Sequence, residues 1–304
     1  MKCTFTGSYV ALPTPFAARG SNPAGALDLA ALKRLVEFHV EHGSDGLVVA
    51  GTSGEAATLS DSERLEAFEA VMECSAGRLP VIAGVGTNDT AHSVELAKAA
   101  AAVGVDGLLA VTPYYNKPSP LGLELHYGAM AEASPLPLVL YNVPGRTGVD
   151  LKPPTIAAIR ERYPHVVAIK EASGTVARAR QIRDASDIAV IVGEDGLIAE
   201  LMGVGAIGVI GVVANVAPAQ TAELVRVSGP GGDAVRAAEL TDFLRPLVRD
   251  LFIESNPAPL KAAMAAMELC SDALRLPLAP LVDANRATLL ATLAEANLLR
   301  EPVR

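Results

Sequence analysis

The sequence has few aromatic residues and no block of basic residues. Aromatic side chains make up 4% of the 304 residues although 50% are hydrophobic, so the apolar mass is mostly Ala, Val, Leu and Ile. These residues typically fill parallel β-strands and the helices that cover them. Lys and Arg number 25 against 34 Asp and Glu, which gives a net charge of −9. That charge argues against a nucleic-acid partner and against binding to an anionic membrane.

Cysteine is also scarce, and long hydrophobic runs are missing. The three cysteines, Cys3, Cys74 and Cys270, are odd in number and scattered along the chain. We therefore expect neither a disulfide framework nor a zinc site, and we expect the protein to be located in a reducing cytoplasm. The segment 1–16 has no long apolar stretch, so we expect no secretory signal. The most apolar run, Leu201 to Ala214, contains four glycines. It is shorter than the roughly 18 to 20 residues of a spanning helix, and we interpret it as a buried strand with its preceding turn.

The chain repeats one theme: a short apolar run, a turn rich in Gly, Pro or Thr, then a longer segment with helical spacing. Several helical segments open with Ser, Thr or Asp, the residues that cap helix N-termini. Continuously apolar strands are buried on both faces, so they pair in parallel and need helical crossovers. The predicted strands are 9–13, 46–51, 80–86, 107–112, 137–143, 166–170, 188–193 and 206–213.

Eight such units predict an α/β fold, a (β/α)8 TIM barrel in residues 1–224. A doubly wound sheet is the competing fold, but no G-x-G-x-x-G motif opens the first helix. Beyond the last predicted strand the pattern is helical, for example in 233–252 and 283–299. We therefore expect a C-terminal helical domain, residues 225–304, packed on the barrel.

Chemistry in such barrels is located at the C-terminal ends of the strands, and Lys170 ends the sixth predicted strand. Burial at the barrel mouth disfavours an ammonium ion, and a neutral amine attacks carbonyl carbons to form a Schiff base. Two alternatives remain open at this point. Lys170 could mark the polar end of a strand, or it could pair with the neighbouring Glu171.

Other strand ends carry polar groups that suit the same chemistry. Tyr141 ends the fifth strand, where a phenol can transfer protons as acid and base. Thr52 and Ser53 offer hydroxyl and N–H groups ahead of a helix predicted near residue 60, which suits a carboxylate. Arg146 lies in a loop rich in Pro and Gly and can hold a carboxylate through two hydrogen bonds. Taken singly, each also fits a plain role: a core tyrosine, a turn, or a solvated arginine.

Motifs of other enzyme classes are missing. The five histidines form no H-E-x-x-H pattern or other set of metal ligands. The turn GVGTN at 84–88 lacks the Lys-Ser/Thr of a phosphate loop, and no G-x-S-x-G elbow occurs. We expect no metal and no cofactor.

Taken together, the strand ends resemble the dihydrodipicolinate synthase family of the N-acetylneuraminate lyase superfamily. The resemblance runs from about Val10 to Pro280, with the motifs in the family's order and spacing. The motifs are GTSGEAATL, VTPYYNKPS, YNVPGRTG, AIKEASG, NPAPLK and LRLPLAPL.

The resemblance implies a role for each residue at the strand ends. Lys170 would form the Schiff base with pyruvate, and Tyr141, Thr52 and Tyr115 would form a proton relay. Arg146 would bind the carboxylate of the second substrate, aspartate 4-semialdehyde. The pyruvate carboxylate would be held by Ser53 and nearby backbone, and the pocket would be lined by Gly193 and Ile210.

The resemblance also implies a lyase of lysine biosynthesis by the diaminopimelate route, with a covalent imine in place of a cofactor. The implied assembly is a homotetramer built as a dimer of dimers. Tyr115 would cross the tight dimer interface. Arg146 favours the synthase, because superfamily members that cleave sugar acids lack the R-T-G ending of this loop. The alternatives are a sister Schiff-base aldolase or dehydratase acting on another keto acid or aldehyde, and a non-catalytic paralogue.

The chain departs from the family pattern in two places. Ser53 replaces a second threonine but keeps the hydroxyl group. At the lysine effector site, inhibited members have an acid where this chain has His92, and histidines at the positions of Asp61 and Arg64, whereas Asn88 and Tyr114 match. Since a partner for the effector's ammonium group is missing, we expect weak feedback by lysine. Strong inhibition by millimolar lysine would contradict this.

Overall fold

Eight parallel strands close into a barrel in the computed structural model, which describes residues 3–17 and 25–299. Each strand pairs with the next along the chain, and β8 returns to pair with β1. The predicted TIM barrel is therefore confirmed and the doubly wound sheet is wrong. The strands are β1 Gly7–Ala11, β2 Gly46–Val49, β3 Val81–Gly84, β4 Gly107–Val111, β5 Leu138–Asn142, β6 Val166–Glu171, β7 Ala189–Val192 and β8 Gly208–Gly211.

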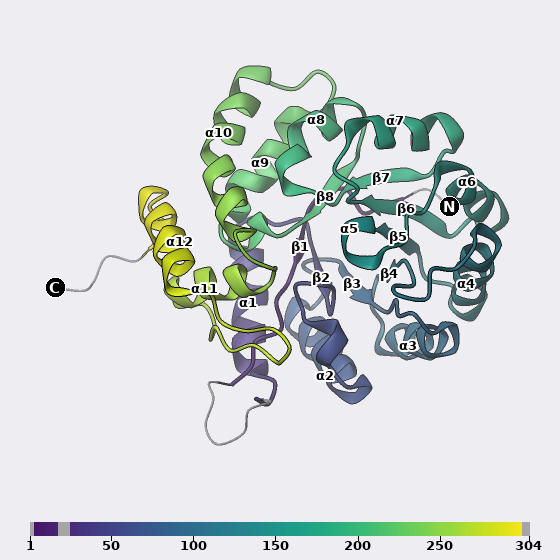
Figure 1. Cartoon of the computed structure of the whole chain (residues 1–304), viewed down its shortest axis with the longest axis horizontal. Helices are drawn as coiled ribbons and strands as arrows, with labels where there is room; N and C mark the ends of the chain where they lie inside the picture. The colour runs from purple at the N-terminus through teal and green to yellow at the C-terminus, as the bar shows by residue number, and fades with distance from the viewer. Residues whose placement is uncertain (1–2, 18–24, 300–304) are drawn as a thin grey trace.

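Helices follow the strands and surround the barrel (Figure 1). The helices up to β8 are α1 Leu29–Glu41, α2 Asp61–Ser75, α3 Thr90–Val103, α4 Pro120–Ala133, α5 Pro144–Thr147, α6 Pro153–Arg162, α7 Val176–Ala185 and α8 Ile198–Gly203. After β8 come α9 Pro218–Ser228, α10 Ala234–Leu251, α11 Ala258–Ala266 and α12 Asp283–Glu295. Short 3-10 helices follow β2, β7 and β8: η1 Ala56–Thr58, η2 Asp195–Leu197 and η3 Val213–Asn215.

Polar caps start several of these helices, as the sequence predicts. Ser60 forms a capping box with Glu63 at the start of α2. The side chains of Asp89 and Asp233 accept hydrogen bonds from backbone N–H groups in the first turns of α3 and α10. These caps fix where each helix begins, and so they fix the length of the loop that precedes it.

The barrel separates two apolar clusters. The larger lies between the strands and the surrounding helices, and the smaller fills the barrel with side chains such as Val48, Ile82, Val139 and Ile191. Successive side chains of a strand point to opposite faces, which is why fully apolar strands are needed here. The interior cluster closes the barrel below the site, so the strand ends form the floor of a pocket and not the mouth of a pore.

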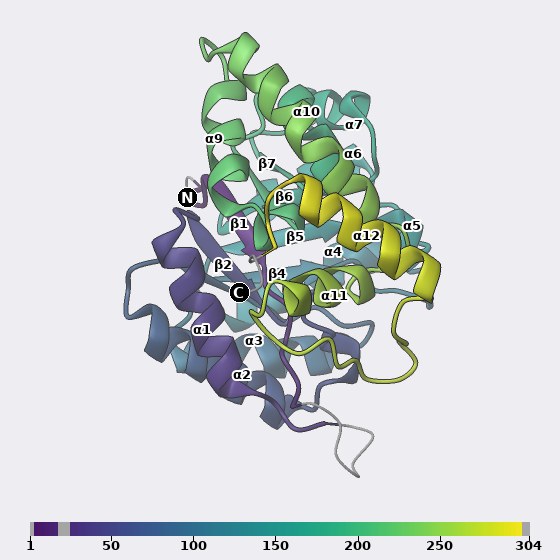
Figure 2. The same ribbon diagram turned by 90° about the vertical axis from the view of Figure 1, so that its left-hand side faces the viewer.

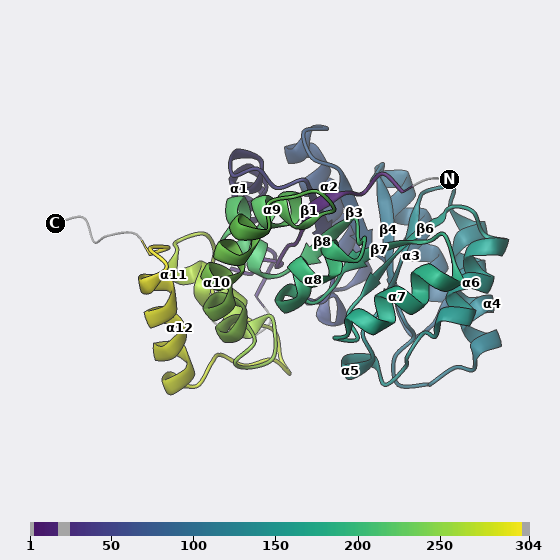
Figure 3. The same ribbon diagram turned by 90° about the horizontal axis from the view of Figure 1, so that it is seen from above.

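The chain after β8 is helical, as predicted, and α10 to α12 lie together on one side of the barrel (Figures 1 and 3). Figure 2 shows α11 and α12 side by side. α10 and α12 fall within the predicted helices 233–252 and 283–299. The predicted domain boundary after residue 224 lies inside α9, and the division into two domains stays a prediction.

The interpretation of the run Leu201–Ala214 is partly wrong. Its first three residues complete α8, and the strand is confined to β8, shorter than the predicted 206–213. Glycine does not disrupt β8 because Gly208 lies against the backbone of Gly7, where a Cβ atom would be 2.3 Å from the Gly7 carbonyl oxygen. Within the described ranges, no helix is both long and apolar enough to cross a bilayer.

Candidate active site

Lys170 and Tyr141 are neighbours across the strand pair β5–β6. Their Cα atoms are partners in the ladder, and Lys170 is in turn the partner of Ile191 on β7. Tyr141 and Ile191 both belong to the cluster inside the barrel, so Lys170 points inward as well. The Nζ atom of Lys170 lies 4.4 Å from the centroid of the Tyr141 ring.

Glu171 points the other way. Its carboxylate accepts hydrogen bonds from the Asn142 side chain at 3.1 Å and from the Ser173 N–H at 2.6 Å. The alternative that Glu171 pairs with Lys170 is therefore wrong, because alternation along β6 places the two side chains on opposite faces of the strand. Lys170 is only 7% exposed, and in the described part of the chain its amine has no hydrogen-bond or ion-pair partner.

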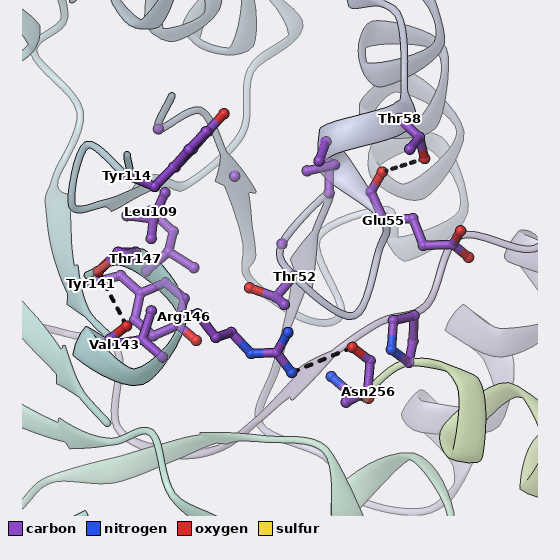
Figure 4. A pocket seen from close by; sticks show the side chains of 18 of the residues that line it. Thr52, Glu55, Thr58, Leu109, Tyr114, Tyr141, Val143, Arg146, Thr147 and Asn256 are labelled. Carbon is purple, nitrogen blue, oxygen red and sulfur yellow. Dashed lines mark hydrogen bonds between the residues drawn. The ribbon is translucent and has the colours of Figure 1, made fainter. Parts of the chain in front are cut away.

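Seven of the eight residues predicted from the sequence line one small cavity at the C-terminal ends of the strands. Its volume is about 90 Å³, and its wall contains Lys170, Tyr141, Thr52, Ser53, Arg146, Gly193 and Ile210. A larger cavity of about 340 Å³ shares Thr52, Tyr141 and Arg146 with it (Figure 4). The inner cavity accommodates a small molecule next to Lys170, and the outer cavity lies beside it.

The loop residues Gly51, Thr52 and Ser53 line this cavity, and two of them carry unused donors. Ser53 is buried, and its hydroxyl oxygen accepts a hydrogen bond from the Asn256 side chain at 3.0 Å. In residues 3–17 and 25–299, the backbone N–H groups of Thr52 and Ser53 have no acceptor. Two free N–H groups beside hydroxyl groups suit a carboxylate.

The helix predicted near residue 60 is confirmed, but it does not supply these donors. It is α2, which begins at Asp61 after the cap residue Ser60, and the 3-10 helix η1 separates it from the loop. The N–H groups of Gly54 and Glu55 are used within the loop, by the carbonyl groups of Gly51 and Thr52. The donors come from the loop backbone, and the α2 N-terminus does not contribute.

Arg146 lies on the one-turn helix α5 at the rim of both cavities. Its side chain is exposed but held, because Nη2 donates to the Asn256 carbonyl oxygen at 3.3 Å (Figure 4). Thr147 fixes the turn beneath it by donating to the Val143 carbonyl at 3.2 Å and accepting a hydrogen bond from Thr112 at 3.1 Å. The guanidinium is thereby positioned above the inner cavity.

Tyr115 is the one predicted site residue that the fold does not bring to the cavity. It does not line either cavity, its side chain is 88% exposed, and its backbone adopts a φ of 76°. A positive φ is unfavourable for a tyrosine, so the neighbouring structure determines the conformation. Its N–H donates to the Thr147 carbonyl at 3.3 Å.

Two carboxylates follow β7. Asp195 is buried, and burial raises its pKa to about 6 although the N–H groups of Val212 and Val213 donate to it. Glu194 is half-buried and lines the inner cavity. Burial raises its pKa, and the nearby positive charge of Lys170 opposes that shift.

Sequence reasoning did not assign a role to Asn256, which links the site to the C-terminal helices. It contacts both Ser53 and Arg146 and lines both cavities. In the sequence it stands only as the first residue of a Pro-rich connection. Its partners Ser53 and Arg146 lie 203 and 110 residues earlier in the chain, so nothing in the local pattern indicates these contacts.

A buried ion pair holds the same helices against the loop after β2. Lys261 of α11 and Glu55 are fully buried and paired, and the Arg275 N–H donates to the second oxygen of Glu55 at 3.0 Å. Lys261 also donates to the Ala273 carbonyl at 2.8 Å. Because Glu55 is only two residues after Ser53, this anchor fixes the loop that carries the free N–H groups.

Of the residues expected at an effector site, Arg64 lines the outer cavity, whereas Asp61 and His92 do not. The His92 ring nitrogen Nε2 lies 2.8 Å from the Asp61 carboxylate, on the surface. Arg64 is buried and lines the cavity with Tyr114.

No group of three or more His, Cys, Asp and Glu among the described residues is arranged to hold a metal ion.

The sequence matches known proteins over almost its whole length. The model of the Dihydrodipicolinate synthetase family matches residues 4–296. A protein of Pelobacter propionicus named 4-hydroxy-tetrahydrodipicolinate synthase is 46% identical over 297 residues, which cover 97% of this chain and 100% of that protein. One of the same name from Geotalea uraniireducens is 45% identical over 303 residues, with the same coverage.

Solved structures of the same kind superpose closely. The dihydrodipicolinate synthase of Aquifex aeolicus has a TM-score of 0.93 and 39% identity, and the match covers 98% of this chain and 100% of that one. The chloride-inhibited enzyme of Acinetobacter baumannii, solved in complex with pyruvate, has a TM-score of 0.93 and 43% identity over 97% of this chain and 100% of its own.

Proposed function

The chain belongs to the Dihydrodipicolinate synthetase family, and we propose that it condenses pyruvate with L-aspartate 4-semialdehyde to give 4-hydroxy-tetrahydrodipicolinate. The observation that carries the proposal is the unpaired, nearly buried Lys170 in a small cavity together with Arg146 and the free N–H groups of Thr52 and Ser53. An amine, a guanidinium and a carboxylate site are what a Schiff-base enzyme for two small carboxylates requires.

In the proposed reaction, the Lys170 amine attacks the carbonyl carbon of pyruvate and water leaves, which forms an imine. Loss of a proton from the methyl carbon gives an enamine. That carbon attacks the aldehyde of the second substrate, whose oxygen takes up a proton. The amine of the bound semialdehyde then adds to the imine carbon, closes the ring and releases Lys170. No cofactor enters this scheme.

The remaining residues bind and transfer protons. Tyr141 and Thr52 line the cavity beside Lys170 and would relay protons together with the partner subunit's Tyr115. Ser53 and the loop N–H groups would bind the carboxylate of pyruvate. Arg146 would bind the carboxylate of the semialdehyde. Gly193 and Ile210 form the wall of the pocket.

The exposure of Tyr115 supports its proposed role across a dimer interface. Near it, Leu121 and Leu125 on α4 are 62% and 58% exposed, so three large apolar side chains face outward on one stretch of chain. Such a patch is typical of a surface that another protein covers. We propose a homotetramer of two tight dimers, located in the cytoplasm, where the free cysteines Cys3, Cys74 and Cys270 would stay reduced.

The test is turnover of the two substrates by the purified protein and by Arg146→Ala. We expect the native protein to convert them, and the variant to lose about 100-fold or more in kcat/KM for aspartate semialdehyde while its imine with pyruvate still forms. Unchanged turnover in Arg146→Ala would favour a sister aldolase or dehydratase with another second substrate.

A further inference from the structure

The inner cavity contains three charged side chains, and only two have a role in the proposed reaction. Lys170 forms the imine and Arg146 binds a carboxylate, while Glu194 has no assigned function. Glu194 is the one carboxylate among the described residues in the cavity wall. Its side chain forms no hydrogen bond or ion pair with any residue in the described ranges.

The other acids nearby are already engaged. Glu171 accepts hydrogen bonds from Asn142 and Ser173, and it points away from the cavity. Asp195 is fully buried and accepts hydrogen bonds from the N–H groups that follow β8. Neither can receive a ligand without breaking these contacts. Glu194, half-buried and unpaired, faces the cavity without a cation bonded to it, although an unpaired carboxylate is costly to bury.

Glu194 also lies close to Lys170, on the side of the cavity that the ammonium group of the second substrate has to reach. Gly193 packs the end of β7 against Lys170, and a Cβ atom there would be 3.0 Å from the Lys170 Cγ atom. Glu194 is the next residue, and its charge interacts with that of Lys170. Ring closure requires the nitrogen of the semialdehyde to reach the carbon that Lys170 holds. The ammonium group of the bound substrate therefore has to lie near the Lys170 side of the cavity.

We propose that Glu194 binds the α-ammonium group of the second substrate while Arg146 binds its α-carboxylate. This inference rests on the proposed function and adds the source of its specificity. The two side chains recognise the two charges of an amino acid, so the site distinguishes an amino-aldehyde from an aldehyde that lacks the amino group. A charged hydrogen bond of this kind contributes a factor of about 10 to 100 in binding.

The experiment compares aspartate 4-semialdehyde with succinate semialdehyde, which lacks only the amino group. For Glu194→Gln we expect the KM for aspartate semialdehyde to rise about 10- to 100-fold. The inhibition constant of succinate semialdehyde should change less than about twofold, because it has no ammonium group to lose. Glu194→Asp should recover part of the loss. Glu200→Gln, on the exposed surface of α8, is the matched control and should behave as the native protein.

Trapping of the pyruvate imine with borohydride separates this inference from the proposed function. Glu194→Gln should still form the adduct at Lys170, because pyruvate has no ammonium group for Glu194 to bind. Equal weakening of both aldehydes would mean that Glu194 supports the shape of the site, and an unchanged KM would mean that it does not touch the substrate; either result overturns the proposal. If the native protein itself did not turn over aspartate semialdehyde, the proposed function would fail, and this inference with it.

Discussion

The Nζ atom of Lys170 lies 4.4 Å from the centroid of the Tyr141 ring, on the adjacent strand of the barrel. The contact leaves the two functional groups of a Schiff-base reaction, an amine and a phenol, in the same small cavity. The ring positions the amine by packing, and the hydroxyl group is available for proton transfer. These two contributions can be separated by mutation.

Tyr141→Phe keeps the ring and removes the hydroxyl group. If the phenol transfers protons, kcat should fall about 100-fold or more, while the variant still forms the pyruvate adduct at Lys170. Steady-state turnover and borohydride trapping measure the two effects. Tyr127→Phe is a suitable control, because Tyr127 is buried between α4 and the barrel and lies in neither cavity. Full turnover in Tyr141→Phe would remove the phenol from the relay.

Gly193 determines how closely β7 approaches the reactive lysine. A Cβ atom at this position would be 2.9 Å from the Ala172 Cβ atom and 3.0 Å from the Lys170 Cγ atom. Gly193→Ala should therefore displace Lys170 and slow imine formation about tenfold or more. The rate of adduct formation under borohydride tests this. At Gly196 the nearest atom is 3.9 Å away, so Gly196→Ala should leave the rate unchanged.

The buried pair of Glu55 and Lys261 predicts a large and specific effect on stability. Lys261→Met leaves the Glu55 carboxylate buried without its cation, which should lower the free energy of unfolding by about 3 to 5 kcal/mol. Adding Glu55→Gln should recover part of this loss. Lys33, whose pair with Glu73 is exposed, provides the control Lys33→Met, with an effect below about 1 kcal/mol. Urea unfolding measures all four proteins, and equal effects of the two lysine variants would contradict the account.

His126 should make the fold sensitive to acid. Burial lowers its pKa from 6.5 to about 4, and only one ring nitrogen has a partner, the Thr90 hydroxyl group at 2.9 Å. Below pH 6.5 the unfolded chain takes up a proton at this residue that the folded chain does not, so stability falls as the pH drops towards 4.

Between pH 7 and 4, the free energy of unfolding of the native protein should fall by about 3 kcal/mol more than that of His126→Gln. Urea unfolding at both values gives the difference, and exposed His42 supplies the control His42→Gln. Parallel losses in the native protein and in His126→Gln would show that another group causes the acid sensitivity.

Much of this structure follows from local sequence patterns. Apolar strands and capped helices predict the barrel, and strand ends such as Lys170 and Tyr141 predict the cavity, because position along a strand determines which end a residue occupies. The patterns do not reveal Asn256, whose partners are distant in the chain, or the bond of Glu171 to Asn142, which lies on the neighbouring strand. The helix predicted near residue 60 does begin there, but the pattern did not indicate the 3-10 helix η1 that separates it from Ser53.

The central claim is that Lys170 forms a Schiff base with pyruvate. The most direct measurement is mass spectrometry of the protein after treatment with pyruvate and borohydride, beside Lys170→Ala. The account predicts a pyruvate-sized adduct on the peptide that contains Lys170, and none in the variant. A folded native protein without an adduct would contradict the mechanism and would favour a non-catalytic paralogue.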